Sequence, residues 1–282
     1  MDQDHVYRPS GGTGVQLEIN PDNAGWTYLS FATVVLGPGE QHSAHLADQE
    51  TAIVPLEGAG TIHAGGQSYN IARESVFTQM PEVLYVPPGV DIEVTTDGSF
   101  EFAIGSAPAE GLLPQRLFTP SEMKTEMRGG GASYRQISHV LAPPIPAERL
   151  ILYEVYVPRG TWSGWAPHCH DGFEGSPYLE ETYYFRLDPA KSAFALHRNW
   201  RIDENFDETL VAEDRDCAIV TKGFHSSVAC PSSNMYFLNY LAGELVGEER
   251  TTPPCFHADH TWIDDAWSNG DEGAWTLPVV GP

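Results

Sequence analysis

Positive charge is scarce in this chain of 282 residues. Fifteen lysines and arginines stand against 39 aspartates and glutamates, which gives a formal net charge of −24. Only three of the cations are lysines (Lys124, Lys191 and Lys222), so the position of each one is informative. A protein that binds polyanions would need a strong local basic patch to overcome this balance. The sequence contains no such patch, and we therefore expect no nucleic acid partner.

Long apolar runs are also missing. No segment approaches the roughly 20 apolar residues that a membrane helix needs. The N-terminal Met-Asp-Gln-Asp-His lacks the basic and apolar regions of a signal peptide. The four cysteines do not show the spacing of a disulfide scaffold. These absences favour a cytoplasmic protein with free thiols and no membrane partner.

Glycine and proline are abundant instead, with 27 and 22 residues. Many stand in turn-like clusters between short runs rich in Val, Ile, Thr and aromatic residues, a pattern that predicts an all-β protein. The exception is Thr119-Pro120-Ser121-Glu122, a capping box that predicts a short helix to about Met127. We therefore expect an N-terminal β-domain over residues 1–110, a connector over 111–131 and a C-terminal β-domain with a tail over 132–282.

The two halves repeat a weak pattern. Each has a histidine pair after a glycine, then a glutamate that opens a strand, then a Val-x-x-Gly turn. The matching residues are His42/His45, Glu50 and Val86–Gly89 in the first half, and His168/His170, Glu181 and Val220–Gly223 in the second. Two residues past the turn glycine the halves differ, with Asp91 in the first and His225 in the second. Such a repeat indicates a duplicated barrel unit.

The second half contains a candidate metal site. In His168-Cys169-His170 the two imidazoles project to one side of a strand and Cys169 to the other, because strand side chains alternate. Glu181 opens a strand-like run, and His225 follows a turn. Three imidazoles and one carboxylate suit a divalent ion such as Zn, Mn, Fe, Ni or Co. A His-x-His pair alone can equally be an ordinary polar edge, and only the added Glu181 and His225 favour metal.

The same reasoning predicts one divalent ion per chain. Its ligands would be His168, His170, Glu181 and His225. The N-terminal half is expected to be metal-free, because Asp91 stands in place of the last histidine and the earlier histidine pair is more loosely spaced.

Several stretches of the chain resemble a known family. They include Arg128-Gly-Gly-Gly, Arg135-Gln-Ile-Ser-His139, Pro167-His-Cys-His-Asp171, Tyr178-Leu-Glu-Glu-Thr-Tyr-Tyr-Phe-Arg186, Lys222-Gly-Phe-His225 and Tyr236-Phe-Leu-Asn239. The ligand pattern resembles that of cupins, and two such units make a bicupin. The stretches are similar to those of the 5-deoxy-glucuronate isomerases of myo-inositol catabolism, relatives of the 5-keto-4-deoxyuronate isomerases. The resemblance covers roughly residues 15–265, and the chain departs from the family at Cys169, His197 and the turn at Lys222.

The resemblance implies a fold and a reaction. The fold would be two tandem double-stranded β-helix (jelly-roll) barrels joined by a short helical connector. The reaction would be a metal-dependent aldose–ketose isomerisation of a deoxyuronic acid, 5-deoxy-glucuronate to 2-deoxy-5-keto-gluconate, through a metal-stabilised enediolate. The partner of the protein would then be a small sugar acid.

Such a reaction needs further side chains beside the metal ligands. A general base is expected at Asp171, directly after the histidine pair, or at Glu208; capping a loop and ending a solvated strand are the structural alternatives. The substrate carboxylate needs a cation, for which Lys222 and Arg198 are the candidates. Tyr183 follows the ligand glutamate by two residues and shares its face, either as a sugar contact or as barrel core.

Two other functions use the same ligands. Some cupins use three histidines and one glutamate for iron-dependent dioxygenation, and a third possibility is a cupin that binds a sugar acid without converting it. Anaerobic turnover would separate the isomerase from both. Exposed edges of β-barrels often pair, so a homo-oligomer is also expected.

Overall fold

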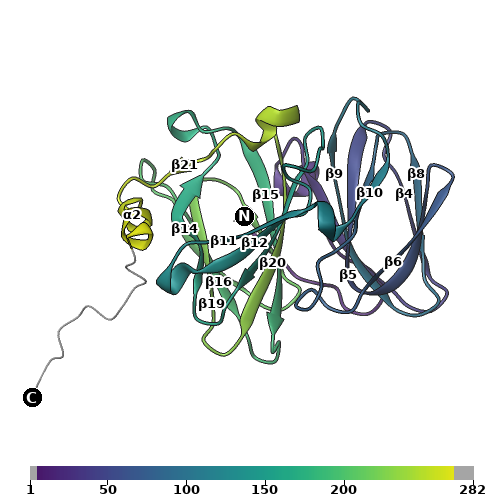
Figure 1. The fold of residues 1–282 in the computed structure, drawn as a ribbon, viewed down its shortest axis with the longest axis horizontal. Coiled ribbons are helices and arrows are strands. Elements are labelled where there is room, and N and C mark those ends of the chain that lie inside the picture. The colour runs from purple at the N-terminus through teal and green to yellow at the C-terminus, as the bar shows by residue number, and fades with distance from the viewer. Residues whose placement is uncertain (1–4, 270–282) are drawn as a thin grey trace, which may run out of the picture.

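The computed structural model describes residues 5–269, and these form two β-rich halves that lie side by side (Figure 1). The all-β prediction is confirmed. Helical structure is confined to two helices, α1 (Pro21–Ala24) and α2 (Trp262–Ser268), and four 3₁₀ turns, η1 (Pro120–Glu122), η2 (Gly131–Ser133), η3 (Phe173–Gly175) and η4 (Gly247–Thr251), within the described residues.

The N-terminal half is a nine-stranded sheet that folds back on itself. Its strands are β2 (Gly14–Ile19), β3 (Ser30–Leu36), β4 (Gln41–His45), β5 (Gln49–Ala64), β6 (Gln67–Arg73), β7 (Val83–Val86), β8 (Asp91–Thr95), β9 (Phe100–Pro108) and β10 (Arg116–Phe118). Strand β5 is long enough to take part in both layers of the folded sheet. Its residues 51–53 pair with β7, and its residues 61–64 pair with β8. An apolar core that includes Ile53, Ile62 and Val94 fills the space between the layers.

The C-terminal half consists of two sheets. The seven-stranded sheet has the order β1 (Val6–Tyr7), β18 (Cys217–Val220), β15 (Leu179–Asp188), β20 (Asn234–Gly243), β13 (Ile151–Val157), β12 (Arg135–His139) and β11 (Lys124–Arg128). The five-stranded sheet has the order β17 (Asp207–Ala212), β16 (Ala195–Trp200), β19 (Phe224–Ala229), β14 (Trp162–Cys169) and β21 (Cys255–Phe256). A second core with Tyr183, Phe185 and Phe237 lies between them.

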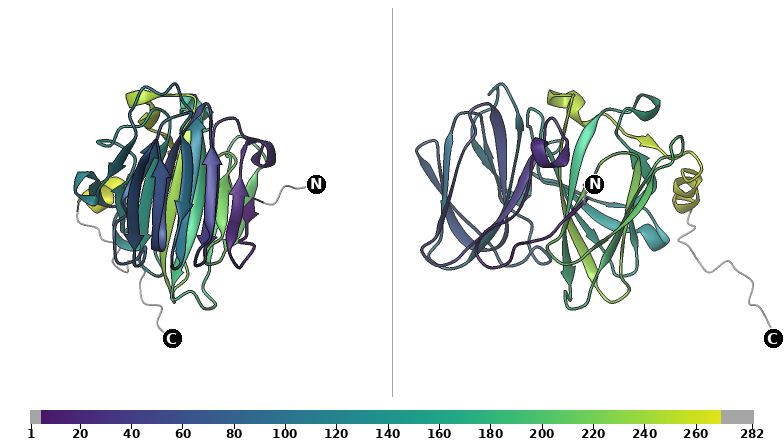
Figure 2. Two further views of the ribbon diagram at one scale, coloured as in Figure 1. Left: turned by 90° about the vertical axis from the view of Figure 1, so that its right-hand side faces the viewer. Right: turned by 180° about the vertical axis from the view of Figure 1, so that it is seen from behind.

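One face of the seven-stranded sheet packs against the N-terminal half, as the views in Figure 2 show. The core between the halves combines Phe31 and Tyr85 of the N-terminal half with Tyr184 and Tyr240 of the C-terminal half. Alternation along β15 therefore sends Tyr184 to this interface and Tyr183 to the interior of the C-terminal half. The site described below lies on that interior side.

The connector differs from the expected helix. The backbone N–H of Thr119 donates to Glu122 at 3.0 Å, so the capping residues do start a helical turn. The turn ends after Glu122, and residues 124–128 form β11 because they pair with β12 along its whole length. The N-terminal strand β1 pairs with β18 of the C-terminal half, so that half also contains residues from the start of the chain.

Among the described residues, none of the helices has the length and hydrophobicity that crossing a membrane requires.

Candidate metal centre

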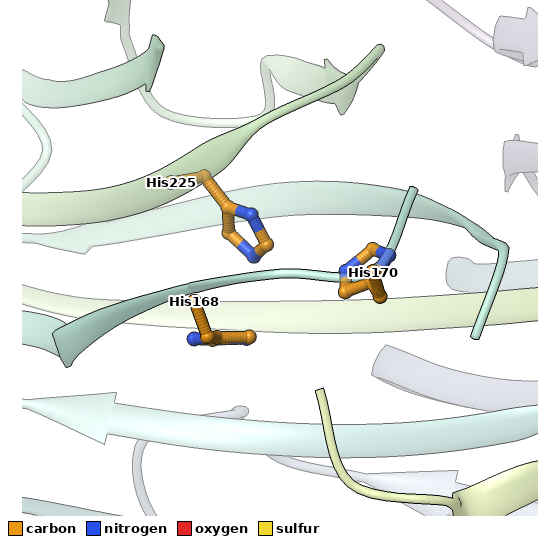
Figure 3. A group of neighbouring side chains, drawn as sticks. All are labelled: His168, His170 and His225. Carbon is orange, nitrogen blue, oxygen red and sulfur yellow. The ribbon is translucent and has the colours of Figure 1, made fainter. Parts of the chain in front are cut away.

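Three histidines meet between two neighbouring strands of the C-terminal half. His168 on β14 lies directly opposite His225 on β19, and His170 comes directly after Cys169, the last residue of β14. One nitrogen from each ring lies within 4.8 Å of the others, and Figure 3 shows the three imidazoles grouped together. The ring centroids of His168 and His225 are 4.4 Å apart. The structure thus brings together three of the four predicted ligands in one group.

Glu181 on β15 lies against two of these histidines. Its Oε2 is 2.8 Å from Nε2 of His170 and 3.2 Å from Nε2 of His225. Nδ1 of His170 is 2.8 Å from the carbonyl of Leu179, a contact that orients Nε2 toward the group. Nε2 of His225 is buried and has no well-formed hydrogen bond in the described structure. An unsatisfied imidazole nitrogen beside two further imidazoles and a carboxylate fits a divalent ion.

The surroundings set the protonation of these groups. Burial, with the nearby His225 and His170, holds the pKa of His168 well below its usual value. Burial raises the pKa of Glu181, but its close contacts with His170 and His225 outweigh burial and lower that pKa overall. Burial alone would lower the pKa of His170. Its contact with Glu181 outweighs burial, so the pKa of His170 is raised overall. The lowered pKa values of His168 and Glu181 favour a neutral imidazole and an ionised carboxylate, the forms that bind metal ions.

Cys169 points away from the group, as the alternation predicts. Its side chain is fully buried and lies opposite Cys255 of β21. It packs against Trp200 and Phe224 on the other face of the sheet. Burial raises the pKa of its thiol, which keeps the group protonated and a poor ligand.

A cavity of about 200 Å³ opens beside the histidine group. Polar or charged side chains that line it are Arg128, Arg135, Tyr153, Ser163, His168, His170, Glu181, Tyr183, Asn239, Thr251 and Thr252. Tyr183 shares the inward face with Glu181, as predicted, and its ring centroid is 5.8 Å from that of His225. Burial and the charge of Glu181 hold the pKa of Tyr183 well above its usual value, so its hydroxyl stays protonated.

Asp171 does not line this cavity. Its Oδ2 accepts hydrogen bonds from Nη1 of Arg201 at 2.6 Å and from the backbone N–H of Gly223 at 2.7 Å. It thereby fastens the segment after His170 to the turn before His225. This placement matches the loop-capping alternative, and the expectation of a general base at this residue finds no support in the geometry.

Glu208 also lies outside the cavity. Its Oε2 is 2.7 Å from Nδ1 of His5, and its Oε1 accepts a hydrogen bond from Asn199 at 2.8 Å. Oδ1 of Asn199 in turn lies 3.0 Å from Nε2 of His197. The ring of His197 is stacked on that of His225, with 6.0 Å between the ring centroids. Glu208 is therefore connected to the histidine group through two buried side chains and cannot reach a molecule in the cavity directly.

The two predicted carboxylate-binding cations face outward. Arg198 pairs with Asp207 at 2.6 Å, and its side chain is 44% exposed. It lies between the buried residues His197 and Asn199 on β16, so it projects from the opposite face. Lys222 pairs with Glu204 on the outside and lies 4.9 Å from the ring centre of Phe206. Neither residue lines the cavity, which corrects the placement expected from the sequence.

Seven polar residues that line the cavity were not among the predicted site residues: Arg128, Arg135, Tyr153, Ser163, Asn239, Thr251 and Thr252. Three of them, Arg128, Arg135 and Asn239, stand in the stretches that carry the family resemblance. That resemblance was the only available signal, because their spacing in the chain gives no hint that they share a cavity.

Comparison with known proteins agrees with the resemblance. Residues 5–263 match the model of the KduI/IolB family. A 5-deoxy-glucuronate isomerase of Geobacillus thermodenitrificans is 36% identical over 255 residues, which cover 89% of this chain and 91% of that protein. A 5-deoxy-glucuronate isomerase of Bacillus subtilis strain 168 is 31% identical over 263 residues, with coverages of 91% and 95%.

Solved structures show the same pattern of similarity. The crystal structure of an IolB-like protein from Salmonella typhimurium LT2 superimposes with a TM-score of 0.86 at 32% identity, covering 92% of this chain and 99% of the other. A mutant of Bacillus subtilis oxalate decarboxylase superimposes with a TM-score of 0.60 at 13% identity, covering 88% of this chain and 79% of the other. At this identity the second match indicates a shared fold alone.

Proposed function

The chain belongs to the KduI/IolB family, and from this premise we propose that it is an aldose–ketose isomerase that converts 5-deoxy-glucuronate to 2-deoxy-5-keto-gluconate in myo-inositol catabolism. The observation that carries the proposal is similarity along nearly the whole chain to relatives named for this activity. The histidine group beside a small cavity supports it, because the reaction needs a site that stabilises negative charge on a sugar.

The proposed ligands of one divalent ion are His168, His170, Glu181 and His225. The donor set of three imidazoles and one carboxylate suits Zn, Mn, Fe, Ni or Co. When bound, such an ion supplies Lewis-acid stabilisation of the negative charge that develops on substrate oxygens. The N-terminal half is proposed to hold no ion.

Two residues that line the cavity and two that lie outside it have separate roles in this proposal. Tyr183, protonated at neutral pH, donates a hydrogen bond to a sugar oxygen. Asn239 on β20 is the cross-strand partner of Tyr183 and offers an amide to the same region. Asp171 is a positioning residue, because its contacts with Arg201 and Gly223 hold the two segments that carry His170 and His225. Glu208 positions His197 through Asn199.

The proposed architecture is a bicupin of two double-stranded β-helix barrels. The fold-level match to oxalate decarboxylase and the repeated strand pairing of the two halves support it. The proposed domains are an N-terminal barrel up to about residue 110, a connector over 111–131 and a metal-binding barrel from 132 onward, with β1 exchanged into the second barrel. A homo-oligomer stays a prediction, which the solution mass would check.

An anaerobic assay tests the function directly. The purified protein, loaded in turn with each candidate metal, is given 5-deoxy-glucuronate without oxygen, and the ketose is followed by NMR. We expect conversion without oxygen. Turnover of a substrate only when oxygen is consumed would instead support the dioxygenase, and tight binding of the acid without turnover would support the sugar-acid-binding module.

A further inference from the structure

Arg135 carries a buried charge that no acid neutralises. The residue is 8% exposed, and its Nη1 contacts only neutral acceptors, the carbonyls of Ser133 at 3.1 Å and Trp165 at 3.3 Å and the Ser133 hydroxyl at 3.4 Å. Its Nε is buried without a partner. Across residues 5–269, no carboxylate forms an ion pair with it. Arg73 is buried more deeply, and it is paired with Glu154 at 2.7 Å, the usual arrangement for a buried guanidinium.

A second arginine stands directly opposite. Arg128 on β11 and Arg135 on β12 are cross-strand partners, and both line the cavity that holds His168 and Glu181. Like charges in such a pair repel each other and destabilise the sheet. Burial, together with the charge of Arg128, lowers the pKa of Arg135 to about 10. Arg128 is half exposed and pairs with Glu126, so of the two guanidinium groups that line the cavity only Arg135 lacks an acid partner among residues 5–269, and a bound anion would supply one.

The backbone makes room for the Arg135 guanidinium. Gly129 has φ +76°, and a Cβ at this position would lie 2.7 Å from Nη1 of Arg135 and 2.2 Å from the Ser133 carbonyl. Any side chain there would push the guanidinium out of its place. The bend after β11 is therefore shaped around a cation that has no acid partner in the described part of the chain.

We propose that Arg135 binds the carboxylate of the substrate, with Arg128 at the entrance of the cavity. The identity of that substrate rests on the proposed function. A uronic acid has its carboxylate at one end and its aldehyde at the other, so a cation and a histidine group that line the same cavity can hold the two ends of one substrate molecule. A guanidinium holds a carboxylate with two parallel hydrogen bonds. In a chain with a net charge of −24, such a local positive site is needed to attract an anion.

Steady-state kinetics with 5-deoxy-glucuronate test the assignment. Loss of a charge-assisted contact predicts that Arg135→Met lowers kcat/KM about ten- to a hundredfold, chiefly through KM, while bound metal stays unchanged. Arg135→Lys keeps the charge without the two-pronged geometry and should lose severalfold. Arg116→Met is the matched control, because Arg116 is half exposed on the N-terminal half and pairs with Glu122. A wild-type KM in Arg135→Met, or a larger loss in Lys222→Met, would overturn the assignment.

Binding of D-glucuronate and of its neutral methyl ester, measured by calorimetry, separates this inference from the proposed function. The wild type should prefer the acid, and Arg135→Met should lose that preference. If the protein does not isomerise 5-deoxy-glucuronate but the preference depends on Arg135, the carboxylate site stands and the proposed function fails. If turnover is normal and the preference survives in Arg135→Met, only the carboxylate site fails. Should Arg135→Met not fold, Arg135→Gln removes the same charge while keeping a polar side chain and provides the same comparison.

Discussion

The two halves of the molecule use the same strand register for different purposes. Thr51 of β5 pairs with Val86 of β7, and Glu181 of β15 pairs with Val220 of β18 in the corresponding place. Thr51 is therefore the counterpart of the proposed ligand Glu181. The sequence repeat had matched Glu50 with Glu181, but the register matches Glu50 with Glu180, one residue earlier.

These two matched glutamates fasten the halves together. The Glu50 carboxylate accepts hydrogen bonds from the backbone N–H groups of residues 148–150 in the C-terminal half. The Glu180 carboxylate does the same for residues 27–29 in the N-terminal half. Each half thus inserts a buried carboxylate into the other. Glu180 and Glu181 are neighbours on β15 and point to opposite faces of the sheet. One carboxylate therefore lies at the interface between the halves and the other at the histidine group.

The interiors of the halves differ at the ligand positions. Where β14 and β19 bring His168 and His225 face to face, β4 and β8 bring together the inward residues Ala44 and Ile92. His45 and Asp91 lie on the outside and pair with each other at 2.6 Å. Both halves therefore have similar frameworks, and a few inward side chains decide whether a metal centre can form.

The largest effect is expected from removing a ligand. His225→Ala should abolish stoichiometric metal binding and lower turnover on the order of a thousandfold, because metal stabilisation is worth several kcal/mol. His45→Ala in the N-terminal half is the matched control and should keep both metal and activity. Elemental analysis and kinetics of the two variants provide the check. Metal lost equally from both would show that the comparison of the halves is mistaken.

The second-largest effect is expected from replacing the two carboxylates at the interface between the halves. Glu50→Gln and Glu180→Gln each replace a charged acceptor by an amide whose NH₂ group faces backbone donors. We expect each to lower the free energy of unfolding by about 3 kcal/mol. Chemical denaturation of the two variants measures this. Similar losses would support equivalent roles, and a loss below about 1 kcal/mol in either would contradict them.

Acid should weaken the C-terminal half first. Burial, together with the nearby His225, lowers the pKa of His197 to about 4 in the folded state. Between pH 6.5 and 4 the imidazole is therefore protonated in the unfolded state but neutral in the folded state. This contribution to stability is therefore lost as pH falls from 6.5 toward 4. His197→Gln should be less sensitive, by about 1 kcal/mol at pH 5.5. Unfolding curves of wild type and variant at pH 7.5 and 5.5 would show it, and an unchanged pH dependence would contradict it.

The smallest effect is expected at Cys169. The thiol faces Trp200 and Phe224 rather than the histidines, so Cys169→Ala should keep metal content and activity within a few-fold of wild type. Loss of the ion in this variant would mean that β14 does not hold its two histidines as a regular strand does.

Alternation was a sufficient guide wherever a strand had one clear inward residue. It predicted that His168 and His170 share a side, that Cys169 does not, and that Tyr183 follows Glu181 inward. It could not place Arg198, because the neighbouring His197 and Asn199 are also polar and the pattern does not reveal which face is buried. The first turn after Thr119 followed local capping, but pairing with β12 made the next residues a strand.

The proposed carboxylate site at Arg135 was not predicted from the sequence, and the reason differs from that for Arg198. Arg135 and Arg128 become cross-strand neighbours only because β11 pairs with β12, and both line the same cavity as His168 and His170 only because β12 belongs to the same sheet as β15. The strand propensity of a segment does not predict which other strand it pairs with, so neither arrangement could be predicted from the sequence. Lys222 was preferred because it lies three residues before His225, yet closeness in the chain did not place it in the cavity.

Metal titration tests the central claim most directly. The protein is stripped with a chelator, and anaerobic turnover of 5-deoxy-glucuronate is measured while a divalent ion is added back. We expect no turnover in the stripped protein and a linear recovery that ends at one equivalent per chain. Turnover by the stripped protein, or a recovery that continues to two equivalents, would contradict a single metal centre in the C-terminal half.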